Sequence, residues 1–130
     1  MNYTIIDVET TISNKGNPFD QNNSLCLVGT TSTPYNNSPQ SIYIIEFDAQ
    51  PYKNNLENLQ LSLDSTDILV GFNIKFDLHW LRKYGIRFNK KRIWDCQLVH
   101  FILTGQNKPY PSLNEVAEHY GIEQKLDTVK

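Results

Sequence analysis

Cysteine is scarce in this sequence, and a long run of apolar residues is missing. The 130 residues include two cysteines, Cys26 and Cys96, which do not form a Cys-x-x-Cys pair. Isolated thiols in apolar surroundings favour buried free cysteines over a disulfide framework or a zinc site. No apolar segment approaches the roughly 20 residues needed to cross a bilayer, and the first residues show no signal-peptide pattern. We therefore expect a cytoplasmic protein without a membrane partner.

An excess of positive charge is missing as well. Twelve Lys and Arg residues stand against fourteen Asp and Glu residues, so the formal net charge is −2. This balance argues against a broad phosphate-binding surface, but it is compatible with a partner gripped at one point through metal ions. We interpret the one basic cluster as solvated surface, with a contact to a DNA backbone or a neighbouring domain as the alternative. The cluster comprises Lys75, Arg82, Lys83, Arg87, Lys90, Lys91 and Arg92.

The order of the predicted elements indicates one mixed α/β domain. Three apolar runs rich in β-forming residues, separated by turn-rich segments, predict an antiparallel meander. In the second half, helical spacing alternates with a short apolar run that is typical of a buried parallel strand. Asp95 is expected to cap one helix, and Ser112 with Glu115 forms a capping box for another. The expected strands span 2–9, 25–32, 41–47 and 67–72, and the expected helices span 54–63, 74–85, 96–105 and 112–121.

Two acidic residues close the first predicted strand, in the segment "TIIDVETT". Side chains alternate along a strand, so Asp7 and Glu9 point the same way, about 6.6 Å apart along the chain. Like charges side by side repel, and a buried pair is costly unless a positive charge lies between them. Either this strand end is exposed and the pair is incidental, or the pair holds a metal ion.

A third acid lies in the segment "ILVGFNIKFDLHWLRKYGI". Asp77 follows Asn73 by four residues at the start of a predicted helix, so the two side chains are expected to share one side of it. Trp80 and Leu81 lie on the same side and are expected to bury it. An inward-facing Asp is unusual unless it is paired. The alternative is an acid that stabilises the helix dipole without any catalytic role.

These stretches together resemble the DEDD exonuclease superfamily and, within it, the 3′–5′ proofreading exonuclease domain of family A DNA polymerases. The segment "DVET" is similar to the first motif of that family, and "GFNIKFDLHWLRKYGI" is similar to the second. The likeness continues through "WDCQLVHFIL" and "PSLNEVAEHYG", so it covers almost the whole chain in order. The segments "SNKGNPFD" and "PYPSL" resemble polymerases of tailed bacteriophages, which would place the protein in an infected bacterial cell.

The resemblance implies a ribonuclease H-like fold and hydrolysis of the 3′-terminal nucleotide of single-stranded DNA with two Mg²⁺ or Mn²⁺ ions. Asp7, Glu9 and Asp77 would be the catalytic residues and metal ligands. Thr10, Asn73, Phe72 and Phe76 would contact the nucleic acid, although core packing is the alternative for both phenylalanines. A polymerase domain, in the same chain or in another, is the implied protein partner.

The family's third motif has no counterpart in the 130 residues. This motif reads Tyr-x-x-x-Asp or His-x-x-x-x-Asp, but Gln124 occupies the position of the acid after both Tyr120 and His119. The late Asp127 falls in a segment that the family places before this motif. We therefore expect residues 1–130 to form a single, incomplete exonuclease domain with its C-terminal part missing, and with weak or no activity. The alternatives are a non-catalytic module that binds nucleic acid or a partner, and an inert fragment.

Overall fold

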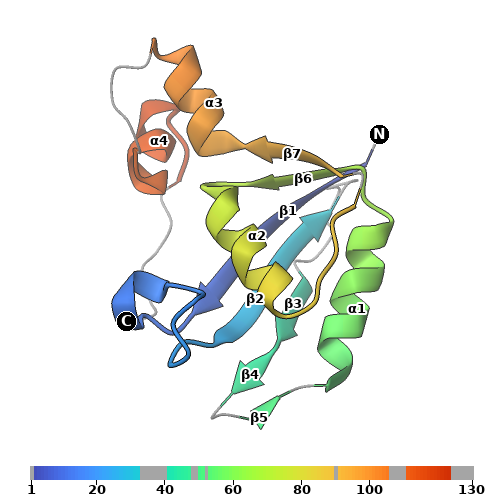
Figure 1. Cartoon of the computed structure of the whole chain (residues 1–130). Helices are drawn as coiled ribbons and strands as arrows, with labels where there is room; N and C mark the ends of the chain where they lie inside the picture. Colours follow the sequence, from blue (N-terminus) through green and yellow to red (C-terminus); the bar gives the residue numbers. More distant parts are fainter. Residues whose placement is uncertain are drawn as a thin grey trace.

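A five-stranded sheet forms the centre of the protein, which we describe from a computed structural model (Figure 1). The structure describes residues 2–32, 41–47, 50–51, 53–89, 91–105 and 111–123. The sheet order is β3-β2-β1-β6-β7, and a small separate sheet pairs β4 with β5. The strands are β1 (Tyr3–Thr10), β2 (Leu25–Ser32), β3 (Ser41–Ile44), β4 (Glu46–Phe47), β5 (Gln50–Pro51), β6 (Ile68–Gly71) and β7 (Arg92–Asp95). The helices are the 3₁₀ helix η1 (Ser13–Gly16), α1 (Lys53–Asp64), α2 (Ile74–Lys83), α3 (Cys96–Leu103) and α4 (Leu113–His119).

Strand β1 lies in the middle of the sheet. It is antiparallel to β2 and parallel to β6, and β6 is in turn parallel to β7. The mixed α/β sheet with antiparallel strands first and parallel strands afterwards is therefore confirmed. No helix in the described part of the chain is long and apolar enough to cross a membrane.

Two elements differ from the sequence prediction. The run at 41–47 was expected to be one strand, but β3 ends at Ile44 and β4 begins at Glu46. The break coincides with Ile45, which is buried and donates its N–H to the carbonyl of Cys26 at 2.9 Å. Strand β7 was not predicted, because its four residues are too few to show a period and it forms by pairing with β6. The predicted turn-rich connection at 33–40 lies outside the described residues, as does the part of the predicted loop 107–111 that precedes Pro111.

The core lies between one face of the sheet and helices α1 and α2. Ile6 and Val8 of β1 are buried there, as are Leu59 of α1 and Trp80 and Leu81 of α2. Figure 1 shows both helices lying across the same face. The apolar side chains that recur at helical spacing in α1 and α2 thus pack onto the even-numbered residues of β1.

The other face of the sheet is more exposed. Ile5 of β1, Ile42 of β3 and Trp94 of β7 retain 40%, 63% and 50% of their accessible surface. Paired strand residues share a face, and Ile5 pairs with Val70, which pairs with Trp94. Asp7 and Glu9 belong to this face, because they alternate with the buried Ile6 and Val8.

Tyr84, at the end of α2, ties this helix to the strands. Its hydroxyl accepts a hydrogen bond from the N–H of Leu25 at 3.0 Å and donates one to Glu46 Oε1 at 3.1 Å. Burial raises the pKa of Tyr84, the Leu25 N–H opposes that shift, and the Glu46 carboxylate adds to it. The neutral hydroxyl is therefore the form that the fold favours.

Replacing Tyr84 with Phe is expected to destabilise the protein by about 1–3 kcal/mol, because the buried Leu25 N–H loses its acceptor. Urea denaturation followed by circular dichroism measures this loss. Tyr120→Phe is the matched control, because the hydroxyl of Tyr120 forms its hydrogen bond with His100 on an exposed surface. Removing that hydroxyl should change the free energy of unfolding by less than about 0.5 kcal/mol. Equal stabilities of the Tyr84→Phe variant and the wild type would contradict the assignment.

Candidate functional site

Asp7 and Glu9 lie side by side at the end of the central strand. Asp7 pairs with Gly29 of β2 and Glu9 pairs with Leu27, so both side chains point away from the α1–α2 face. Together they line a shallow hollow of about 230 Å³, whose other walls include Ile42 and Thr31. The hollow opens to solvent, so water can hydrate both carboxylates, and two adjacent acids on the central strand do not carry the cost of a buried pair.

The end of β1 departs from regular pairing just after these acids. Glu9 pairs with Leu27 but Thr10 pairs with Leu25, which marks a β-bulge. A bulge bends the strand and re-aims its side chains. The Thr10 hydroxyl donates to the carbonyl of Thr11 at 2.9 Å. The extra residue is Cys26 of β2, which has no partner in β1. Thr10 points away from the open face that carries the two acids because side chains alternate along β1.

Asn73 lies in the left-handed region, with φ 55° and ψ 51°, and precedes the first residue of α2. The expectation that Asn73 and Asp77 share one side of the helix is wrong. Asn73 is exposed, whereas Asp77 is only 5% exposed. The i, i+4 rule holds between helical residues, and Asn73 does not have helical backbone angles. The inward direction predicted for Asp77 itself is confirmed.

Phe76 and Thr10 meet at Gly16. A Cβ atom at Gly16 would lie 3.2 Å from Phe76 Cζ and 3.3 Å from Thr10 Oγ1, and Gly16 has a φ of +74°. Both the backbone angle and the crowding therefore require glycine there. Phe76 also packs against the core, as the structural alternative for this residue predicted. This contact brings the end of β1 beside the first turn of α2, where Asp77 lies.

Asp95 lies where β7 meets α3. Its Oδ1 atom accepts the N–H of Gln97 at 3.0 Å, which confirms the predicted helix cap. The same carboxylate also accepts the N–H of Asn73 at 2.9 Å and the N–H of Ile74 at 3.3 Å. The sequence gives no local signal for this second role, because the partners are 22 and 21 residues apart.

The three candidate acids belong to neighbouring elements at one edge of the sheet. Strands β1 and β6 are parallel, so the end of β1 and the start of α2 after β6 lie at the same edge, where ligands bind in open α/β sheets. Among the residues that the structure describes, however, no three acid, histidine or cysteine side chains are grouped closely enough to hold a metal ion. The assignment of Asp7, Glu9 and Asp77 as ligands therefore stays a prediction.

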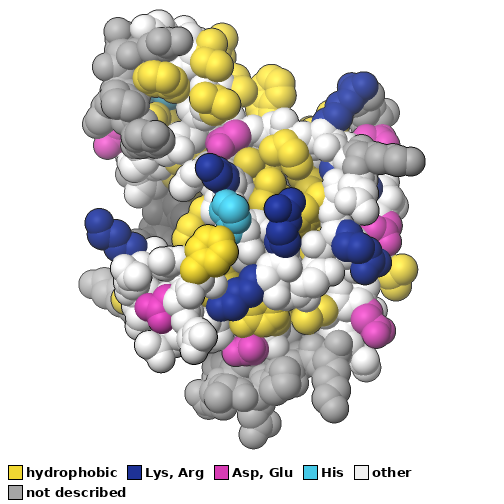
Figure 2. Space-filling view, viewed as in Figure 1, with side chains coloured by type: hydrophobic (Ala, Val, Ile, Leu, Met, Phe, Trp, Pro, Cys, Tyr) yellow, Lys and Arg dark blue, Asp and Glu magenta, His cyan; other side chains and the backbone are white. Residues whose placement is uncertain are grey.

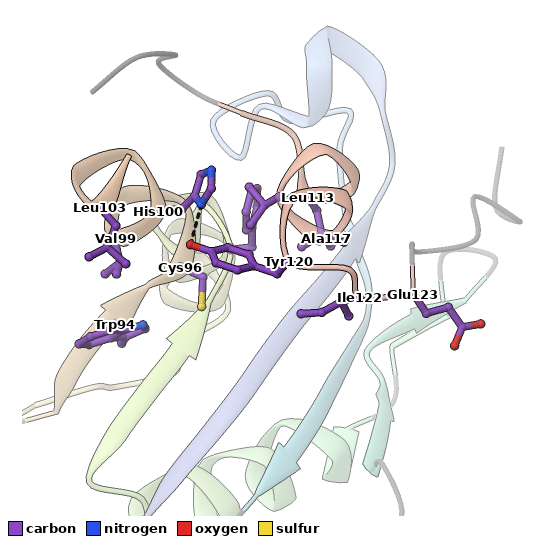
Figure 3. A pocket seen from close by; sticks show the side chains of 12 residues that line it. Trp94, Cys96, Val99, His100, Leu103, Leu113, Ala117, Tyr120, Ile122 and Glu123 are labelled. Carbon is purple, nitrogen blue, oxygen red and sulfur yellow. Dashed lines mark hydrogen bonds between the residues drawn. The ribbon is translucent and has the colours of Figure 1, made fainter. Parts of the chain in front are cut away.

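A larger hollow of about 600 Å³ lies between α3, α4 and the ends of β6 and β7 (Figure 3). Its walls are mainly apolar and include Phe72, Trp94 and Leu113. His100 and Tyr120 cross it with a hydrogen bond of 3.0 Å between Nδ1 and Oη. Sequence reasoning missed this pairing, because no regular spacing joins the two residues. The hollow lacks the three candidate acids, so it is not their binding site.

The cysteines are free thiols, as expected, and both are half-buried. Burial raises the pKa of Cys26, and the charges of Glu46 and Glu9 raise it further. Burial also raises the pKa of Cys96, and the charge of Asp95 raises it further. A hydrogen bond donated by the Trp94 side chain opposes this shift. Neither thiol has the low pKa of a reactive nucleophile.

The basic residues are spread over the surface. Figure 2 shows Lys and Arg side chains scattered across the α1–α2 side of the molecule rather than gathered in one patch. Lys83 lies 4.9 Å from the centre of the Trp80 ring, and Lys91 donates to the backbone carbonyls of Asp64 and Thr66. These contacts tie both side chains to the protein, which agrees with the interpretation as ordinary surface.

The fold is similar to that of solved structures whose chains are longer than this one. One is a family B DNA polymerase from the hyperthermophilic archaeon Pyrobaculum calidifontis, with a TM-score of 0.65 and 11% identity over 95% of this chain and 18% of that one. Another is NrnC of Brucella melitensis, with a TM-score of 0.65 and 17% identity over 98% of this chain and 57% of that one. No protein-family model and no curated protein sequence matches the chain.

These likenesses support the ribonuclease H-like α/β fold that the sequence predicts. At 11% and 17% sequence identity, the two similarities show the fold of this chain but not its activity. The chain spans about a fifth of the polymerase and somewhat more than half of NrnC. Neither similarity singles out family A polymerases or bacteriophage proteins.

Mn²⁺ is expected to raise the melting temperature of the protein, because an ion relieves the repulsion between Asp7 and Glu9 and binds only the folded state. Asp7→Asn should abolish this gain. Glu57→Gln on the exposed surface of α1 is the matched control and should keep it. Differential scanning fluorimetry with and without Mn²⁺ measures both. An Asp7→Asn variant with the full metal response would show that Asp7 is not a ligand.

Proposed function

We propose that this chain is a DEDD-type exonuclease domain that removes nucleotides from the 3′ end of single-stranded DNA. One observation carries the proposal: two adjacent carboxylates end the central strand of a ribonuclease H-like sheet, and a third begins the helix after the neighbouring parallel strand. The similar fold of a DNA polymerase supports it. The finer assignment to a family A, bacteriophage-type proofreading domain rests on the motifs "DVET" and "GFNIKFDLHWLRKYGI".

The donor set fits a hard divalent cation, because carboxylate oxygens are the ligands that Mg²⁺ and Mn²⁺ prefer. Asp7 and Glu9 would hold the ion from the open hollow. Asp77 is buried on α2, which packs on the opposite face of the sheet, so it would reach the same ion past the carboxyl ends of β1 and β6. When bound, such ions neutralise phosphate charge and activate water for attack on a phosphodiester. The first two acids are already oriented by β1, so little conformational entropy is lost when they bind.

The protein's own residues would place the 3′ end against these acids. Thr10 follows Glu9 directly, but its hydroxyl donates to the carbonyl of Thr11, so its backbone would make the contact with the terminal nucleotide. The exposed Asn73 offers an amide beside the start of α2. Phe76 is occupied by core contacts, so we assign it a supporting role rather than a stacking one. Phe72 lines the larger hollow, apart from Asp7 and Glu9.

A second candidate function is a non-catalytic module that holds a nucleic-acid 3′ end or a partner protein. The observation that favours it is the lack of a three-residue metal cluster in the described part of the chain. The sequence also supplies three of the four carboxylates that the resemblance implies. A domain with a partial metal site would bind the same substrate and leave it intact.

The test of function is the metal-dependent shortening of a 5′-labelled oligonucleotide, read as a ladder that recedes from the 3′ end. We expect slow shortening in Mn²⁺ or Mg²⁺, and we expect Asp7→Asn and Asp77→Asn each to lower the rate about 10²- to 10³-fold. Glu57→Gln should match the wild type. If the wild type binds the oligonucleotide but leaves it intact, then the binding module is the correct function. Shortening that survives both Asp substitutions would mean that other groups perform the chemistry.

A further inference from the structure

We propose that Asp95 is the positioning residue of this site, because it fixes the first turn of α2 and thereby the place of Asp77. This inference rests on the proposed function for its catalytic consequence, but its structural part stands on contacts of the described residues. The Asp95 carboxylate receives three backbone N–H groups from two helices. The sequence alone assigned it only the cap of α3.

The contact follows from the strand register. Gly71 at the end of β6 pairs with Asp95 at the end of β7, so the two chains leave the sheet side by side. Two residues after Gly71 the chain turns through the left-handed Asn73 into α2. The Asp95 carboxylate lies where the N–H groups of Asn73 and Ile74 point out of this turn.

The charge of Asp95 suits its position. The first N–H groups of a helix have no partner within the helix, and they give its N-terminus a partial positive charge. Helices α2 and α3 both begin at this carboxylate, so one negative charge stabilises two helix starts. Asn73 has no side-chain cap of its own for α2, and Asp95 supplies this cap from another strand.

Asp77 depends on this cap because it lies in the first turn of α2. The turn closes with a hydrogen bond of 3.1 Å from the N–H of Phe76 to the carbonyl of Asn73. Behind it, a Cβ atom at Gly71 would lie 2.9 Å from Ile74 Cγ1, so the turn is packed directly on β6. A carboxylate that must meet a metal ion within a fraction of an ångström needs such support.

Asp95→Ser separates the two roles of the carboxylate. Serine is a good helix cap, so it can still accept the N–H of Gln97, but its shorter side chain cannot also reach α2. Asp95→Asn is the conservative variant, since it keeps one acceptor oxygen. Ser112→Ala is the matched control, because it removes a comparable cap from α4 and no contact with α2.

The experiment combines amide hydrogen exchange by NMR with two functional readouts, the Mn²⁺-dependent rise in melting temperature and the shortening rate. For Asp95→Ser, we expect exchange at Asn73 and Ile74 to accelerate by about tenfold, since each lost hydrogen bond is worth on the order of that factor. Exchange at Gln97 should change less. Both functional readouts should fall, Asp95→Asn should restore part of each, and Ser112→Ala should leave all three unchanged.

Each outcome decides a separate point. Unchanged exchange at Asn73 and Ile74 in Asp95→Ser would overturn the proposal, as would faster exchange with a full metal response and full activity. If the wild type never shortens the oligonucleotide, then the proposed function fails. In that case, exchange and the metal response still decide whether Asp95 positions Asp77.

Discussion

The central position of β1 is the constraint on which the rest of the structure depends. Thr4, Ile6 and Val8 point into the core, and the Thr4 hydroxyl shares a hydrogen bond of 2.6 Å with that of Thr66. The intervening Asp7 and Glu9 must then point to the opposite face. A slip of one residue in pairing would bury both carboxylates and expose the apolar side chains, so the register of β1 is strongly determined. The same alternation builds the core and presents the acids.

Beyond β1 on one side, the parallel strands β6 and β7 would supply the second half of the candidate site. Parallel strands end at a common edge, and a helix follows each of these two. The start of α2 is held from below by the packing of Ile74 on Gly71 and from the side by Asp95. Rigid elements, rather than loops, therefore set the positions of all three candidate acids, as precise chemistry requires.

The sequence predicted those features of the fold that local physics determines. Strand β2 matches the expected span, and the caps at Asp95 and Ser112 were recognised because a capping side chain acts on its own helix. The features it missed depend on distant partners. Strand β7 forms by pairing with β6. The left-handed turn at Asn73 is held by Asp95, and the expectation that Asn73 and Asp77 share one side of the helix was wrong because Asn73 lies in this turn. The pairing of His100 with Tyr120 likewise follows from the packing of α3 against α4.

The central claim is that Asp7, Glu9 and Asp77 meet around divalent metal ions, and a crystal structure of the protein in Mn²⁺ tests it most directly. Anomalous scattering locates manganese independently of the protein atoms. We predict a manganese peak at coordination distance, roughly 2.0–2.2 Å, from oxygens of Asp7 and Glu9, with the Asp77 carboxylate turned toward the same centre. Manganese bound elsewhere, or an Asp77 carboxylate on the order of 8 Å from the ion, about twice the usual spacing of paired metals, would contradict it.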